Sequence, residues 1–95
     1  MSDLCNEIEK FGKAVGNASR YRLVEVLFRG PKTVSELVRV TKLSQPLVSQ
    51  HLKVLKASGL VSDERHGQEV VYTVNAEYTI KLLQRLTSEI KKPTL

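Results

Sequence analysis

Two consecutive helix starts, separated by a turn of a few residues, constrain the fold of this chain more than any other feature. Thr33 and Glu36 have the spacing of a capping box, which predicts a short helix over Val34–Thr41. Ser44 has the residue type of the next helix cap, and the helix that it starts should end at Gly59. Two helices joined by so short a turn form a helix-turn-helix.

The rest of the sequence predicts helices before this motif and a hairpin and a helix after it. Apolar residues recur at helical spacing near both ends of the chain, whereas beyond Gly59 they alternate with a period of two. Gly67 lies between two runs of β-forming residues and supplies the positive φ that a hairpin turn favours. The expected helices are about 3–15, 19–29 and 76–92, and the expected strands are 60–65 and 69–74.

These elements predict a mainly α protein with a small β-hairpin (α+β), a winged helix-turn-helix in the order α-α-α-α-β-β-α. The chain has 95 residues, so we expect a single domain over residues 1–95. We expect the first and last helices (about 3–15 and 76–92) to bury apolar surface against a second subunit, because a core with no Trp and two Phe is thin. The second helix should have a wide apolar face, formed by Tyr21, Leu23, Val24, Leu27 and Phe28.

The composition favours an anionic partner. The net charge is +5 and the pI is about 9.6, as expected for a chain that binds nucleic acid. No apolar run approaches the roughly 20 residues of a membrane-spanning helix, so we expect no membrane partner. The start of the chain lacks the apolar stretch of a signal peptide. The single cysteine, Cys5, excludes an intrachain disulfide, and we expect a cytoplasmic protein.

The segment between Leu37 and Ser62 contains no acidic residue and carries four basic ones. On its longer helix, Gln45 and Ser49 should meet base edges, because Gln amides and Ser hydroxyls form hydrogen bonds there. Two lysines farther along this helix should contact phosphates. We therefore predict double-stranded DNA as the partner, bound through Ser44, Gln45, Pro46, Ser49, Gln50, Lys53, Lys56, Arg65, His66 and Gln68.

Two positions near this surface allow alternative interpretations. His51 borders the apolar face of its helix, so it either packs inside the protein or contacts DNA. In the hairpin, Arg65 could enter a minor groove or meet a phosphate. The neighbouring Asp63, Glu64 and Glu69 argue against a wholly cationic hairpin.

We do not expect an enzyme. The sequence contains no Gly-rich phosphate loop, no pair of catalytic carboxylates and no Cys/His nucleophile arrangement. The alternative function is a protein–protein interaction module that does not bind DNA, because winged helices also serve in this way. The acid-free segment argues against this alternative, since an adaptor surface has no need to exclude acids.

The order of elements and two motifs closely resemble the ArsR/SmtB family of bacterial transcriptional repressors. The stretch from Leu43 to Val61 is similar to the family's recognition-helix region, and Asn17 to Leu23 is similar to its Asn/Asp-x-x-Arg-x-x-(Ile/Leu) motif. The resemblance implies a homodimeric, sequence-specific regulator that binds an inverted-repeat operator and is released by a ligand. It also implies dimer contacts on the first and last helices, at Leu4, Ile8, Phe11, Ile80, Leu83, Leu86 and Ile90.

The chain departs from this family at the sensing sites. Many members carry Cys-Val-Cys-Asp-Leu on the third helix, where this chain has Thr-Val-Ser-Glu-Leu at 33–37. Residues 76–95, where other members bind zinc, contain Glu77 and Glu89 but no His, Cys or Asp. Soft metals need Cys or His ligands, so we predict no metal and no cofactor. Cys5 is either a redox sensor or a lone cysteine with no sensing role, and the effector is not predicted.

Overall fold

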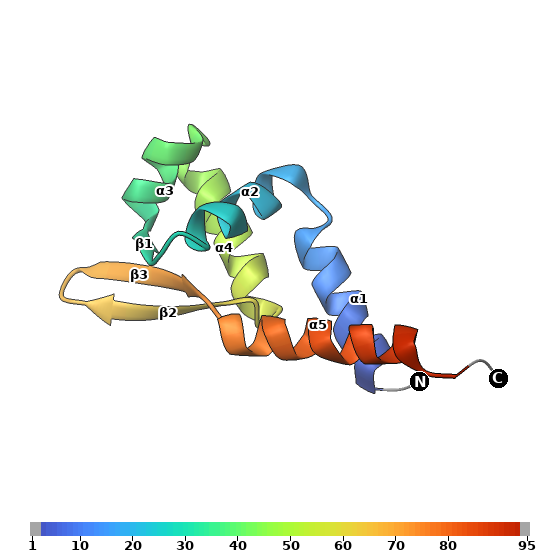
Figure 1. Cartoon of the computed structure of the whole chain (residues 1–95). Coiled ribbons are helices and arrows are strands. Elements are labelled where there is room, and N and C mark those ends of the chain that lie inside the picture. Colours follow the sequence, from blue (N-terminus) through green and yellow to red (C-terminus); the bar gives the residue numbers. More distant parts are fainter. Residues whose placement is uncertain (1–2, 94–95) are drawn as a thin grey trace.

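A computed structural model describes residues 3–93 and has the expected fold class (Figure 1). The helices are α1 (Asp3–Val15), α2 (Ala18–Leu27), α3 (Val34–Thr41), α4 (Gln45–Ala57) and α5 (Ala76–Lys91). The strands are β1 (Lys32–Thr33), β2 (Val61–His66) and β3 (Glu69–Val74). The helix-turn-helix consists of α3 and α4, and the hairpin of β2 and β3 forms the wing.

The structure adds a short strand, β1, that the sequence did not predict. This strand pairs antiparallel with β3, with Lys32 opposite Tyr72 and Thr33 opposite Val71, and the sheet order is β1-β3-β2. A strand of two residues is too short to show an alternating pattern, so the sequence carries no periodic signal for it. The pairing attaches the segment that precedes α3 to the middle of β3.

Capping side chains define where four helices begin, and the caps that the sequence predicts at Thr33 and Ser44 are among them. The Thr33 hydroxyl accepts a hydrogen bond from the Glu36 N–H (3.2 Å), and the Glu36 carboxylate accepts one from the Thr33 N–H (3.0 Å). This reciprocal pair is a complete capping box, and its hydrogen bonds lower the pKa of Glu36. Asn17, Ser44 and Asn75 each accept from the backbone N–H three residues ahead, at 3.0, 3.4 and 3.2 Å.

The core lies between α2, α3, α4 and the start of β2. Its buried members are Ala14, Leu23, Val24, Leu27, Leu37, Val48, Leu52, Leu55, Leu60 and Val61. Of the apolar face predicted for α2, only Leu23, Val24 and Leu27 are buried, whereas Tyr21 and Phe28 are 43% and 55% exposed. Apolar residues occur on several sides of α2, so their spacing alone does not identify the face that packs inside.

The end of α4 is joined closely to the start of α5. Gly59 has a φ of +88°, and a Cβ atom at this position would lie 3.5 Å from the ring of Tyr78. The Asn75 N–H donates a hydrogen bond to the Leu60 carbonyl (2.8 Å), which also links the cap of α5 to the segment that follows α4. The Tyr78 hydroxyl donates to the Glu7 carboxylate of α1, and this bond raises the pKa of Tyr78.

The molecule is elongated, with principal extents of 53 × 24 × 22 Å. The wing projects at one end, and α1 and α5 contact each other near the other end (Figure 1). Leu82 is the one buried residue of α5, at 2% exposure, and the sequence analysis did not single it out. Within residues 3–93, no helix is long and apolar enough to cross a membrane.

Candidate nucleic-acid interface

The α4 helix has one buried face and one exposed polar face. Val48, His51, Leu52 and Leu55 point into the protein. The opposite side carries the predicted contact residues, and all of them are exposed: Ser44, Gln45, Pro46, Ser49, Gln50, Lys53 and Lys56. The cap and the first turn of α4 therefore present hydrogen-bonding side chains to solvent, with no carboxylate on the helix. Such a face matches the donors and acceptors of a major groove.

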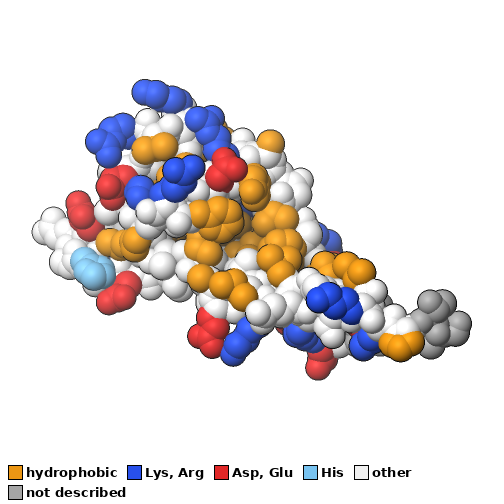
Figure 2. All heavy atoms as spheres, viewed as in Figure 1, with side chains coloured by type: hydrophobic (Ala, Val, Ile, Leu, Met, Phe, Trp, Pro, Cys, Tyr) orange, Lys and Arg blue, Asp and Glu red, His pale blue; other side chains and the backbone are white. Residues whose placement is uncertain are grey.

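Basic side chains gather over the part of the molecule that contains α3 and the start of α4. Figure 2 shows Lys and Arg side chains clustered over this part in the view of Figure 1. Arg39, Lys42 and Lys53 in this segment are exposed. Positive charge around a helix end that offers polar side chains is the electrostatic pattern of a DNA-binding surface.

Lys56 differs from the other lysines of this segment. Its Nζ lies 2.9 Å from one carboxylate oxygen of Asp63 and donates to the other at 3.0 Å. The hydrogen bond and the charge of Asp63 raise the pKa of Lys56. This pair ties α4 to β2, so Lys56 has a structural role that the sequence analysis missed. Its charge is partly neutralised by Asp63, so Lys56 is a weaker candidate for a phosphate contact than Lys53.

The tip of the wing carries three predicted contact residues, Arg65, His66 and Gln68, and all are exposed. They surround Gly67, whose φ of +66° is the conformation expected at the turn. The His66 Nε2 lies 3.6 Å from a carboxylate oxygen of Glu64. The wing therefore presents Arg65 as its cation among acidic neighbours, which fits one phosphate or minor-groove contact better than a broad basic surface.

His51 lies inside the protein, which decides between the two interpretations of this residue. It is 6% exposed, and neither ring nitrogen has a hydrogen-bond partner among residues 3–93. Burial lowers the pKa of His51, and the nearby positive charge of Arg20 lowers it further. Arg20 itself donates to the carbonyls of Ala14 (2.7 Å) and Lys13 (2.9 Å) at the end of α1. His51 is therefore a packing residue of α4 and is not part of its exposed face.

The buried His51 leads to a prediction about acid stability. The folded protein holds the pKa of His51 below its ordinary value of 6.5, so the unfolded chain takes up a proton more readily. The contribution of the uncharged His51 to the free energy of unfolding is complete above about pH 6.5. It is lost as the pH falls toward the lower pKa that His51 has in the folded protein. His51→Leu should remove this loss and raise the free energy of unfolding at neutral pH by about 1–2 kcal/mol, because it removes unpaired buried polar atoms.

Urea unfolding of the wild type and the His51→Leu variant, measured between about pH 5 and pH 8, tests this prediction. His66→Gln is the matched control, because it removes an exposed histidine. A pH dependence of the same size in the wild type and the His51→Leu variant would contradict the prediction.

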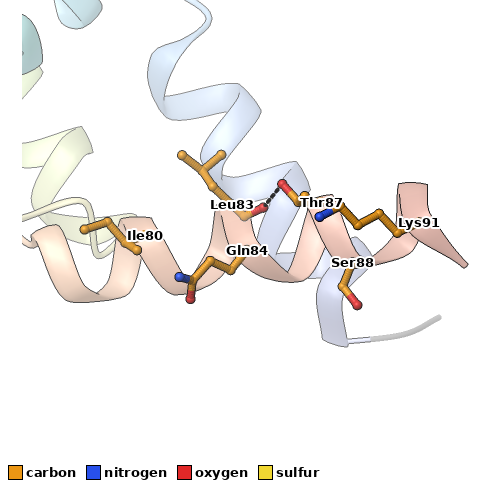
Figure 3. Close-up of a pocket in the computed structure, with 6 residues that line it drawn as sticks. All are labelled: Ile80, Leu83, Gln84, Thr87, Ser88 and Lys91. Atoms are coloured by element: carbon orange, nitrogen blue, oxygen red, sulfur yellow. Dashed lines mark hydrogen bonds between the residues drawn. The ribbon is translucent and has the colours of Figure 1, made fainter.

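The predicted dimer contacts differ in exposure between the two terminal helices. Ile80, Leu83, Leu86 and Ile90 of α5 are 54%, 43%, 39% and 78% exposed. Their counterparts on α1, which are Leu4, Ile8 and Phe11, are half-buried. Figure 3 shows an open depression on α5, lined by Ile80, Leu83, Gln84, Thr87, Ser88 and Lys91. Within it, the Thr87 hydroxyl donates to the Leu83 carbonyl (2.9 Å). This face of α5 is apolar and accessible.

Candidate sensor residues are spread over the structure. Cys5 is exposed on α1. Thr33, at the position of one of the family's two third-helix thiolates, is engaged with Glu36 in the capping box. Among residues 3–93, no group of three or more His, Cys, Asp or Glu side chains is placed to hold a metal ion.

The chain is similar to known regulatory proteins of bacteria. Residues 17–63, which run from the cap of α2 into β2, match the family described as bacterial regulatory protein, arsR family. The chain is 47% identical over 60 residues to the HTH-type transcriptional repressor SmtB of Mycobacterium tuberculosis, covering 63% of this chain and 44% of that protein. It spans 44–59% of the length of the curated relatives that it matches first.

Two solved structures have a similar fold. HlyU from Vibrio cholerae has a TM-score of 0.75 and 32% identity, covering 90% of this chain and 97% of that chain. The second is the homodimeric winged helix-turn-helix DNA-binding domain of a possible ArsR-family transcriptional regulator from Mycobacterium bovis. It has a TM-score of 0.73 and 25% identity, and the alignment covers 97% of this chain and 92% of that chain.

Proposed function

Because the chain belongs to the arsR family of bacterial regulatory proteins, we propose that it is a homodimeric transcriptional repressor that binds an inverted-repeat operator. The observation that carries this proposal is the outer face of α4, which is exposed, free of carboxylates and rich in hydrogen-bonding side chains. The protein acts in the cytoplasm on double-stranded DNA, without a membrane partner, and its effector is unidentified.

In this proposal, α4 is the recognition helix and enters the major groove by its N-terminal end. Gln45 bonds to an adenine edge and Ser49 reaches a neighbouring base, because an amide and a hydroxyl suit these groups. Lys53 contacts a phosphate, and Arg65 of the wing contacts the backbone or an adjacent minor groove. Ser44, Pro46, Gln50, His66 and Gln68 complete the contact surface, and Lys56 contributes less because Asp63 already holds it.

The exposed apolar stripe of α5 supports the homodimer. A helix that leaves four large aliphatic side chains accessible along one side has apolar surface to bury against another chain. The similar Mycobacterium bovis domain is described as homodimeric. A two-fold dimer presents two recognition helices in opposite directions, so its operator has two inverted half-sites.

Repression is supported by the relatives, among which the Mycobacterium tuberculosis SmtB and the Bacillus subtilis SdpR are named repressors. A repressor of this kind occupies its operator until an effector binds and releases it. Cys5 is exposed on α1, one of the two proposed dimer helices, and is an accessible position for a redox signal in this scheme.

The Gln45→Ala substitution should weaken discrimination between operator and mismatched duplexes by about 1–3 kcal/mol, because it removes a base-reading amide. Lys53→Gln should weaken binding to every duplex about equally and lower the salt dependence by about one phosphate contact per subunit. Fluorescence-anisotropy titrations on an inverted-repeat operator and on a scrambled duplex, over a salt series, measure both effects.

These two variants separate base reading from phosphate contact on the same helix. If neither variant changes DNA binding, the assignment of α4 as the recognition helix is wrong. If the wild type binds no duplex at low salt, the protein is an interaction module and not a DNA-binding regulator.

A further inference from the structure

Lys42, in the turn between α3 and α4, has a backbone conformation that its residue type disfavours. Its φ of 64° and ψ of 12° lie in the left-handed region. It is the only residue other than glycine with a positive φ among residues 3–93. In this region the Cβ atom approaches the following carbonyl oxygen too closely, so glycine, and next asparagine, are the usual occupants. A lysine at this position therefore strains the turn.

The conformation is imposed by neighbouring groups and does not depend on the Lys42 side chain. The Lys42 N–H donates to the Val38 carbonyl (2.9 Å) and closes the end of α3. Thr41, which is buried, donates from its hydroxyl to the Leu37 carbonyl (2.7 Å) and accepts from the Leu43 N–H (3.3 Å). A glycine or an asparagine in place of Lys42 would keep all three bonds, so the fold gives no reason for a lysine.

The ammonium group of Lys42 is not used within the described chain. The side chain is exposed and forms no hydrogen bond or ion pair with any of residues 3–93. Two other lysines are used within the protein, since Lys56 pairs with Asp63 and Lys81 with Glu77, each at 2.9 Å. A residue kept in a strained conformation, with a charge that has no role inside the protein, points to a contact outside it.

The surroundings of Lys42 select an anion as that contact. It lies two residues before Ser44, the cap of α4, where the partial positive charge of the helix dipole is concentrated. It also lies within the segment from Val38 to Val61, which contains no acidic residue. We infer that Lys42 contacts a DNA phosphate beside the groove that α4 enters, an inference that rests on the proposed DNA-binding function. The long flexible stem of lysine can place its compact charge on a phosphate without a fixed geometry.

The Lys42→Asn variant separates the effect on the fold from the effect on DNA. Asparagine tolerates the left-handed region, so the Tm should stay unchanged or rise by a few degrees. The Kd for duplex DNA should increase about five- to tenfold near 0.1 M salt, and the salt slope should fall by about one per bound subunit. The change should be equal on operator and scrambled duplexes, because a phosphate contact reads no sequence.

Three further variants make the experiment decisive. Lys42→Gly, a second variant without the charge, should match Lys42→Asn, and Lys42→Arg should retain most of the affinity. Lys10→Gln removes an equal charge from the exposed surface of α1, away from the helix-turn-helix, and should leave the Kd and the slope unchanged.

The outcomes distinguish this inference from the proposed function. If Lys53→Gln lowers the salt slope and the charge-free Lys42 variants do not, the Lys42 inference is overturned and the proposed function stands. Equal weakening by Lys10→Gln would assign the effect to net charge and overturn the inference as well. If the wild type binds no duplex at low salt, both the inference and the proposed function are wrong.

Discussion

Replacing Leu82 with alanine should lower the free energy of unfolding by about 2–5 kcal/mol, the range for truncating a buried leucine. Leu82 is 2% exposed and is the only buried residue of α5. It lies outside the main core cluster, on the helix that packs against α1. Its loss removes the one side chain of α5 that is fully withdrawn from water, so the variant should unfold at a clearly lower urea concentration.

Leu83→Ala is the matched control for this prediction, because it makes the same chemical change one residue farther along the helix. Leu83 is 43% exposed, so its truncation should cost the isolated subunit less than about 1 kcal/mol. Both variants are compared by urea unfolding at one low protein concentration, since self-association makes stability depend on concentration. A larger loss for Leu83→Ala than for Leu82→Ala would mean that α5 packs through a different face.

The adjacent residues Leu82 and Leu83 illustrate what the sequence could not decide about α5. Helical spacing in the sequence reveals the stripe of Ile80, Leu83, Leu86 and Ile90. A stripe that packs on the subunit's own core and one that packs on another chain have the same spacing. In the structure this stripe is exposed and Leu82 packs inside, so only the tertiary arrangement identifies the inward face.

Features that depend on a few neighbouring residues were predictable. The caps Asn17, Thr33, Ser44 and Asn75 all act on a backbone N–H three residues ahead, so their signals are local. The turn at Gly67 was predictable for the same reason. Among these positions, Thr33 and Ser44 determine where the two helices of the helix-turn-helix begin. The start of α4 in turn determines which of its side chains face outward.

Features that depend on contacts between separate elements were not predictable. The exposure of Tyr21 and Phe28 depends on which elements cover α2. Apolar residues occur on several sides of that helix, so the sequence does not indicate which side is covered. The ion pair of Lys56 with Asp63 forms only when β2 folds back along α4. The left-handed conformation of Lys42 follows from the way Thr41 closes α3, which no spacing rule indicates.

The double substitution Ile80→Glu and Leu83→Glu should convert the protein to a monomer and weaken its binding to an inverted-repeat operator by about 10²–10⁴-fold. Both side chains are accessible on the apolar side of α5, where two carboxylates per subunit would be buried and would repel each other in a two-fold dimer. In the dimer, binding of the first half-site places the second recognition helix at a high effective concentration, and the monomer loses this advantage.

Affinity for a single half-site distinguishes loss of the dimer from damage to the DNA-binding surface. The double variant should bind an isolated half-site as a wild-type subunit does. The substitutions are on α5, whereas the proposed DNA contacts are on α4 and the wing, and the buried Leu82 still anchors α5. Lys81→Gln is the control, since it lowers the charge at an exposed position of α5 outside the depression. Sedimentation and operator titrations would contradict the dimer if the double variant stayed dimeric, or if a monomeric variant kept full affinity for the operator. Weak binding to the isolated half-site would instead place part of the DNA contact on α5.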